Sequence, residues 1–186
     1  MSWQVVRLAD VPATPWRNGG GVTRELAAWP ASVDWRWRLS VADIDNSGPF
    51  SRFEGVQRWF AVLGGAGVEL DVNGKQHRLT AGDAPFCFDG SAATHCRLLE
   101  GKTQDFNLML RQGRGRARMG RVSSSLPIAV DAPKTIAVYA ISTGASVLFD
   151  DEKLDLPAHS LAWRTVTVKA TLRLSTAQAL WMEIPA

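Results

Sequence analysis

The chain has 186 residues, of which 46% are hydrophobic and 21% are charged. A chain of this length buries roughly 70% of the surface that its unfolded form exposes, so it can build a core without disulfides or a structural metal. The composition excludes a disordered or fibrous protein, and the longest apolar runs, such as 59–63, are too short to span a bilayer. A net charge of +3 does not require nucleic acid as a partner, whereas sixteen arginines against five lysines favour anion recognition through guanidinium groups.

The N-terminal residues predict a cytoplasmic protein. They lack the basic start, the apolar stretch and the small-residue cleavage site of a secretory signal. The chain has only two cysteines, Cys87 and Cys96, and we expect both thiols to be reduced.

Two-residue alternation of apolar and polar side chains recurs along most of the chain and predicts a nearly all-β protein. The clearest strand covers 35–42, and Asn73-Gly74 predicts a hairpin between two later strands. Short strands at this spacing indicate a sandwich, a jelly roll or a barrel. The expected strands cover 35–42, 56–63, 67–72, 75–80, 84–88, 93–99, 103–111, 135–142, 145–149, 153–156, 160–168, 171–175 and 179–184.

A stretch rich in Gly, Arg and Ser at 112–125 predicts a linker between two halves. We therefore expect two stacked jelly-roll or β-barrel halves, 1–111 and 126–186, and the N-terminal strand could swap between them. The glycine-spaced arginines of 111–121 could follow a phosphate backbone, but no aromatic residue is interleaved with them. A solvated linker is the favoured interpretation, and nucleic acid is not expected.

Several blocks mix polar, charged and aromatic residues. In 15–25, three consecutive glycines follow Trp16, Arg17 and Asn18; this pattern fits either a tight loop or an exposed set of backbone N–H donors, and it lacks the Walker spacing. In the strand 35–42, Arg38 and Ser40 share a face that is either solvated or lines a polar cavity with partners for its charges.

The blocks 48–53, 86–90 and 105–109 fit either turns and core alternation or a small-molecule pocket. His77, His95 and His159 are isolated in sequence, so we expect surface positions for them and no bound metal. No nucleophile elbow is present, and no residue is assigned as catalytic.

Five blocks in this order resemble the HutD/Ves family: 15–26, 37–42, 48–58, 88–90 and 105–109. The resemblance implies an all-β bicupin that lacks the cupin metal ligands and any cofactor, in the bacterial cytoplasm. In the HutD branch it implies control of histidine utilisation by binding a pathway intermediate such as urocanate or formylglutamate. The Ves branch is associated with a response to temperature or stress.

Carried over by motif, the resemblance places twelve residues at a ligand pocket: Trp16, Arg17, Asn18, Gly19, Thr23, Arg38, Ser40, Phe50, Ser51, Arg58, Asp105 and Asn107. The arginines of these motifs outnumber the carboxylates, so at least one guanidinium should be left to bind an anion. We expect a small anionic metabolite as the ligand and a regulatory role.

Two alternatives remain open. A cofactor-independent enzyme could act on a small polar carboxylic acid with Asp105 or Glu25 as a general base. A pure interaction protein could dock onto a regulator through its outer sheet. The sequence leaves the choice between a monomer and a homodimer open.

Overall fold

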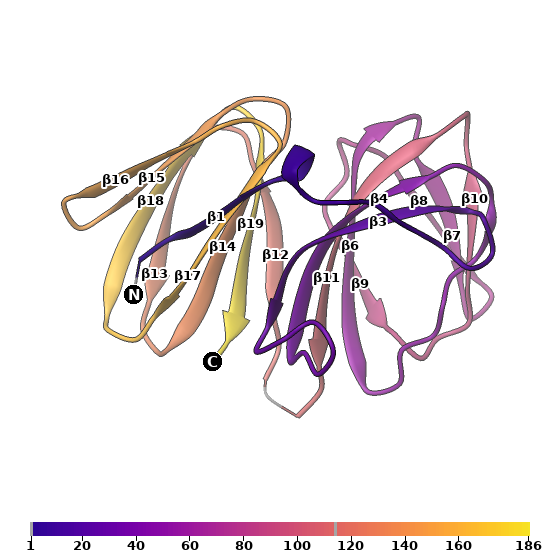
Figure 1. Ribbon diagram of the computed structural model, residues 1–186, viewed down its shortest axis with the longest axis horizontal. Helices are drawn as coiled ribbons and strands as arrows, with labels where there is room; N and C mark the ends of the chain where they lie inside the picture. Colours follow the sequence, from indigo (N-terminus) through magenta and orange to yellow (C-terminus); the bar gives the residue numbers. More distant parts are fainter. Residues whose placement is uncertain (1, 114) are drawn as a thin grey trace. The chain divides into compact units, whose positions relative to one another are not determined.

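The computed structural model describes residues 2–113 and 115–186 (Figure 1). These residues form antiparallel strands and one short 3-10 turn, η1 (Leu8–Asp10), which confirms the nearly all-β prediction. None of them belongs to a helix with the length and apolarity needed to cross a membrane. The chain divides into two compact units, an N-terminal unit (Val11–Gly113) and a C-terminal unit that combines residues up to Asp10 with those from 115 onward.

The N-terminal unit contains two antiparallel sheets. The larger sheet has the order β2 (Thr14–Pro15), β3 (Gly21–Trp29), β4 (Trp37–Ile44), β11 (Thr103–Arg111), β6 (Val56–Gly65), β9 (Phe86–Asp89). The smaller sheet has the order β5 (Gly48–Pro49), β10 (Thr94–Leu98), β7 (Val68–Val72), β8 (Lys75–Leu79). Distant segments thus become neighbours, because β11 pairs with β4 on one side and with β6 on the other.

Strand β11 is buried on both of its faces. Phe106, Leu108 and Leu110 lie on one face, as the alternation predicts, and are almost completely buried. Asp105 and Asn107 on the opposite face are also buried, although both are polar. Buried polar groups require hydrogen-bond partners. The buried polar face of β11 is therefore a candidate for a functional site.

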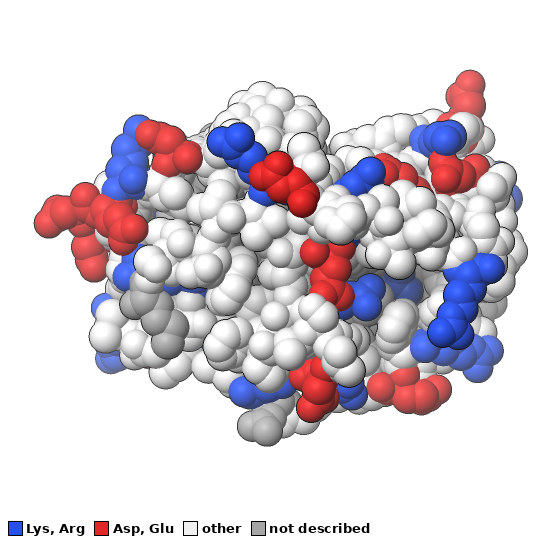
Figure 2. All heavy atoms as spheres, viewed as in Figure 1, with Lys and Arg blue, Asp and Glu red and all other residues white. Residues whose placement is uncertain are grey.

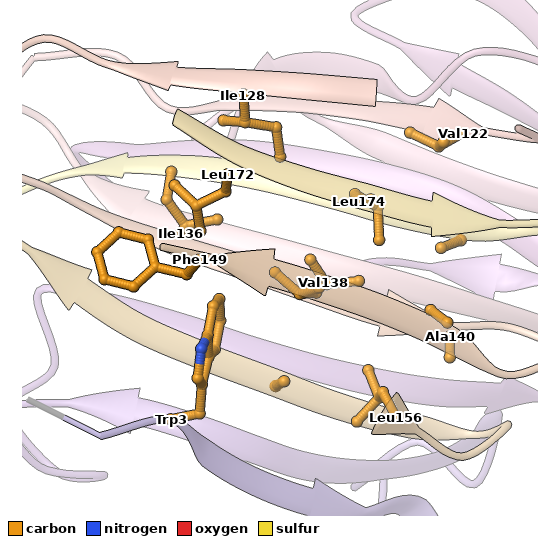
Figure 3. Close-up of a cluster of buried hydrophobic side chains, with 14 of the residues drawn as sticks. Trp3, Val122, Ile128, Ile136, Val138, Ala140, Phe149, Leu156, Leu172 and Leu174 are labelled. Carbon is orange, nitrogen blue, oxygen red and sulfur yellow. The ribbon is translucent and has the colours of Figure 1, made fainter. Parts of the chain in front are cut away.

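The C-terminal unit also contains two antiparallel sheets. One has the order β1 (Gln4–Arg7), β17 (Ser160–Val166), β14 (Lys134–Ala140), β19 (Ala179–Pro185), β12 (Arg118–Val122). The other has the order β13 (Ser125–Val130), β18 (Ala170–Thr176), β15 (Ala145–Phe149), β16 (Glu152–Leu156). Apolar side chains from both sheets form one cluster, and the ring of Trp3 points into it beside Val138 and Phe149 (Figure 3).

The expected linker at 112–125 is wrong over 118–122 and at its last residue. It contains β12, which pairs with β19, and its last residue begins β13. The glycine content of this stretch suggested a linker, but Gly120 is needed for packing within a strand. A Cβ there would lie 2.6 Å from Nε1 of Trp181, so only glycine lets the indole lie against this strand. The guanidinium of Arg118 covers the same ring at 5.5 Å. Residue 114 of the expected linker lies outside the described residues.

The N-terminal strand takes the swapped position that the sequence alone left open. β1 pairs with β17 over four residues, so the first strand belongs to the C-terminal unit rather than to the half that follows it in sequence.

Basic and acidic side chains are interspersed on the face shown in Figure 2, without a continuous basic stripe on that face.

We expect Trp3→Ala to lower the free energy of unfolding by about 3 kcal/mol or more, because it empties a large volume in the core of the C-terminal unit. Val5→Ala, on the strand that directly follows Trp3 but 46% exposed, is the matched control and should cost about 0.5 kcal/mol. Urea unfolding followed by circular dichroism measures both. Equal losses in the two variants would show that the N-terminal segment does not depend on the buried indole.

Candidate functional site

A cavity of about 510 Å³ lies within the N-terminal unit. Eleven of the twelve residues expected from the sequence line it, and the twelfth, Gly19, is not among its lining residues. The lining consists of Pro15, Trp16, Arg17, Asn18, Thr23, Arg38, Ser40, Ala42, Pro49, Phe50, Ser51, Phe53, Arg58, Asp105, Asn107 and Met109. The segments involved are spread over 95 positions of the chain, and the sheet pairing brings them together.

The register of the larger sheet builds the polar floor of this cavity. On one row, Met109 of β11 pairs with Arg38 of β4 and with Arg58 of β6. Two residues earlier on β11, Asn107 pairs with Ser40, and Asp105 forms the next row. Alternate residues of a strand share a face, so the side chains of these rows on β4, β6 and β11 all face the same cavity.

The turn before β3 forms part of the rim. The backbone N–H of Gly19 donates to the carbonyl of Trp16, and the Asn18 side chain accepts from the N–H of Gly20, so the glycine block closes a tight turn. Gly21 must be glycine because a Cβ there would lie 2.3 Å from the carbonyl oxygen of Asp43. The loop interpretation of this block therefore holds, and the turn positions Trp16 and Asn18 rather than offering three free N–H groups.

Aromatic residues complete the wall. The Trp16 indole N–H donates to Oγ1 of Thr23 at 2.7 Å, and the ring meets Phe50 edge to face at 6.1 Å. The segment that carries Phe50 and Phe53 is tied by backbone hydrogen bonds to Thr94 and Gly90. These bonds give the 48–53 block its shape.

Arg58 is the most deeply buried cation among the cavity's lining residues. It is 7% exposed, and its Nε and Nη2 atoms both donate to Oδ1 of Asn107, at 3.1 and 3.0 Å. Its guanidinium lies 4.6 Å from the ring centre of Phe50 and 5.4 Å from that of Phe88. Burial lowers the pKa of Arg58 to about 10, so the side chain stays charged at neutral pH. Within the described part of the chain, no carboxylate oxygen lies within 4.0 Å of this guanidinium.

Asp105 is the buried carboxyl of the floor and is 1% exposed. Its Oδ1 accepts from Nδ2 of Asn107 at 2.5 Å, whereas its Oδ2 has no hydrogen-bond partner among residues 2–113 and 115–186. Burial raises the pKa of Asp105 to about 7, against the smaller opposing effect of the Arg58 charge. Asn107 thus connects an unpaired cation to a carboxyl that titrates near neutrality.

The remaining arginines of the motifs differ in their partners. Nε of Arg38 lies 3.6 Å from Oε2 of Glu25, and Arg24 pairs with Asp43 at 2.7 Å and does not line the cavity. Arg17 lies exposed in the rim turn. Arg58 is therefore the buried guanidinium of the cavity floor without a carboxylate oxygen within 4.0 Å, and Nε of Arg38 is a second buried donor there that has no hydrogen-bond partner within the described residues.

Sequence reasoning missed five lining residues, all of them apolar: Pro15, Ala42, Pro49, Phe53 and Met109. Ala42 and Met109 lie two positions from expected residues on the same strand, so strand periodicity could have identified them. Of the histidines, His77 packs against Phe86, and His95 and His159 are exposed. No three His, Cys, Asp or Glu side chains of the described residues are grouped as metal ligands.

We expect Asp105→Asn to stabilise the protein at about pH 8. The ordinary pKa of the carboxyl is 3.8 and its folded value is about 7, so the folded protein holds a proton that the unfolded chain has released between these values. The free energy of unfolding of the natural protein therefore falls as the pH rises through this range, by up to about 4 kcal/mol, and the neutral amide escapes this loss.

Urea unfolding at a series of pH values measures this difference. The advantage of the variant should shrink as the pH is lowered and should vanish below the ordinary pKa of 3.8, where Asp105 is protonated in both states. Parallel stability curves for the two proteins across that range would contradict the raised pKa.

Comparison with known proteins adds to this geometry. The HutD family model matches residues 8–182. An uncharacterised 21.2 kDa protein of the hutC 3′ region in Pseudomonas putida is 38% identical over 146 residues, which cover 77% of this chain and 76% of that protein. Protein Ves of Cronobacter sakazakii is 34% identical over 175 residues, or 94% of each chain.

Solved structures agree with these matches. HutD from Pseudomonas fluorescens SBW25 is 32% identical and superposes with a TM-score of 0.87 over the whole of both chains. Salicylate 1,2-dioxygenase from Pseudoaminobacter salicylatoxidans is only 10% identical but has a TM-score of 0.66, with 99% of this chain and 81% of that one covered. That second likeness shows the cupin fold alone. The chain is thus an all-β bicupin, and it belongs to the HutD/Ves family.

Proposed function

We propose that the cavity of the N-terminal unit binds a small carboxylate metabolite and that the protein acts through this binding as a regulator of histidine utilisation. The observation that carries the proposal is the environment of Arg58. It is a buried cation whose hydrogen-bond acceptor is a neutral amide, and it borders a cavity large enough for a metabolite.

The energetics of Arg58 favour an anionic ligand. Removing a charged group from water costs several kcal/mol unless a partner of opposite charge compensates for it. The carbonyl dipole of Asn107 and the faces of Phe50 and Phe88 compensate in part. A bound carboxylate would supply the missing charge and form charge-assisted hydrogen bonds of roughly 1.5–3 kcal/mol.

The rest of the lining suits a short polar acid. Trp16, Phe50 and Met109 offer apolar surface to a carbon chain, while Ser40 and Ser51 offer hydroxyls. For a ligand of about a dozen heavy atoms, roughly 0.3–0.6 kcal/mol per atom gives a binding free energy of about −4 to −7 kcal/mol. That range corresponds to millimolar to micromolar Kd, which suits a protein that reports when an intermediate accumulates.

The names of the relatives support the link to histidine utilisation. One relative comes from the hutC 3′ region, and another is HutD itself, whose structure was determined in a formate condition. Formylglutamate and urocanate are small carboxylates of the kind that this cavity would hold, so they are the first compounds to test.

Replacement of Arg58 tests the proposal. We expect N-formyl-L-glutamate or urocanate to raise the melting temperature of the natural protein, since a ligand that binds only the folded state stabilises it. Arg58→Met places an apolar side chain between Phe50 and Phe88 and should weaken binding in calorimetry by about 30-fold or more.

Arg97→Met is the matched control for that experiment, because Arg97 lies in the same unit and pairs with Glu69 at the surface. It should leave the affinity unchanged. Binding that survives in Arg58→Met as in Arg97→Met would remove Arg58 from the site, and a panel of carboxylates without any thermal shift would overturn the proposed function.

Arg38 is the second cation of the cavity floor: its buried Nε has no hydrogen-bond partner within the described residues and lies 3.6 Å from Oε2 of Glu25. We expect Arg38→Ala to weaken carboxylate binding by about 2 kcal/mol without unfolding the protein. If calorimetry gives the same Kd for this variant and the natural protein, Arg38 lines the cavity without contributing to ligand binding.

A second candidate function rests on Asp105. A buried carboxyl with a pKa of about 7 that borders a cavity can act as a general base in a cofactor-independent enzyme. Turnover of a candidate intermediate by the pure protein, abolished in Asp105→Asn, would favour catalysis. Binding without turnover would favour the regulator.

A further inference from the structure

Asp105 has one engaged oxygen and one oxygen without a partner. Oδ1 accepts from Asn107, and Asn107 in turn accepts from Arg58, so the chain of hydrogen bonds fixes which oxygen is used. Oδ2 is buried, has no hydrogen-bond partner within the described residues, and belongs to a side chain that lines the cavity. A buried polar atom in this state calls for an explanation.

The charge balance of the floor changes when an anion enters. Without a ligand, the floor holds the Arg58 cation and the Asp105 carboxyl, joined through a neutral amide. This inference rests on the proposed function, in which a ligand carboxylate takes the Arg58 guanidinium. Two carboxylates would then share one cation in a buried site, where like charges repel strongly and one of them becomes protonated.

The neighbouring groups do not relieve this repulsion. Arg38, across the floor on β4, has Glu25 as its ion-pair partner. Asp43, also on β4, adds negative charge, although Arg24 and Gln104 bind it. On β10, burial raises the pKa of the Cys96 thiol to about 12, so that group stays neutral. Asp105 is therefore the group whose protonation can restore neutrality.

We propose that Asp105 takes up one proton when the cavity binds a carboxylate, and that Oδ2 then donates this proton as a hydrogen bond to an oxygen of the ligand. The proton comes from the solvent, and no covalent bond of the ligand changes. Binding is thereby linked to pH: the protein in which Asp105 is already neutral binds the anion more tightly. Asp105 becomes a residue that selects for an acceptor oxygen on the ligand.

The physical basis also fixes the direction of the pH effect. In the free protein, burial already raises the pKa of Asp105 to about 7, and the charge of a ligand carboxylate raises it further. Above that pKa each binding event must take up a proton from the solvent, so the Kd should rise by up to about tenfold per pH unit. Below it, the proton is already present and the Kd should be nearly constant.

Calorimetry of N-formyl-L-glutamate binding tests this inference. The measurement is made at about pH 8 and about pH 5.5 in buffers with different enthalpies of ionisation, because the dependence of the observed heat on the buffer gives the number of protons taken up. Formylglutamate suits the test since both of its carboxyls are ionised at these pH values. We expect close to one proton per ligand at the higher pH and close to none at the lower one.

Two variants separate Asp105 from other acids. Asp105→Asn presents an amide that can donate an N–H from the position of the proton. This variant should therefore bind the ligand without proton uptake, and its Kd should be the same at the two pH values. Glu69→Gln makes the same carboxyl-to-amide change at the surface of the unit, where Glu69 pairs with Arg97, and should keep the proton uptake of the natural protein.

The outcomes distinguish this inference from the function on which it rests. Binding at about pH 8 without proton uptake would overturn the inference and leave the anion site intact, with Asp105 ionised and accepting a hydrogen bond from the ligand. Proton uptake that persists in Asp105→Asn would overturn the assignment to this residue. Absence of binding at both pH values, in the natural protein and in Asp105→Asn, would overturn the proposed function itself.

Discussion

The guanidinium of Arg58, buried against a single amide oxygen, is the interaction on which the rest of the candidate site depends. Its Nε and Nη2 atoms converge on Asn107, and two phenylalanine rings cover its faces. Such an arrangement keeps the charge in place without neutralising it. The N-terminal unit accommodates the cost within a sheet whose other face is tightly packed with apolar side chains.

Strand β11 shows how one element serves both stability and chemistry. Its odd-numbered residues Asp105, Asn107 and Met109 line the cavity, while the even-numbered residues between them are fully apolar and buried. A slip of one residue in its pairing with β4 and β6 would exchange the two sets and place the carboxyl in the apolar core. The burial of both faces therefore fixes the register on which the site relies.

The C-terminal unit has a different character. Its two sheets enclose a cluster of aliphatic and aromatic side chains that includes Trp3 from the N-terminal segment (Figure 3). The family motifs all lie in the N-terminal unit, as does the cavity. Two units of similar architecture thus differ in this respect: the N-terminal unit has a cavity beside a polar floor lined by the motif residues, and the C-terminal unit has an apolar cluster that includes Trp3.

The sequence by itself determined the class of fold and the composition of the site. Period-two alternation located β11 and β15 with their observed ends, and the motifs named eleven of the residues that line the cavity. It missed β12, because a glycine that accommodates Trp181 reads as a linker, and it left open which half holds the N-terminal strand, because strand pairing between distant segments leaves no local signal. Only the tertiary structure decided which arginine lacks a carboxylate partner and that Asp105 titrates near neutrality. Both properties arise from burial and from the distances between strands far apart in the chain, which local residue patterns do not contain.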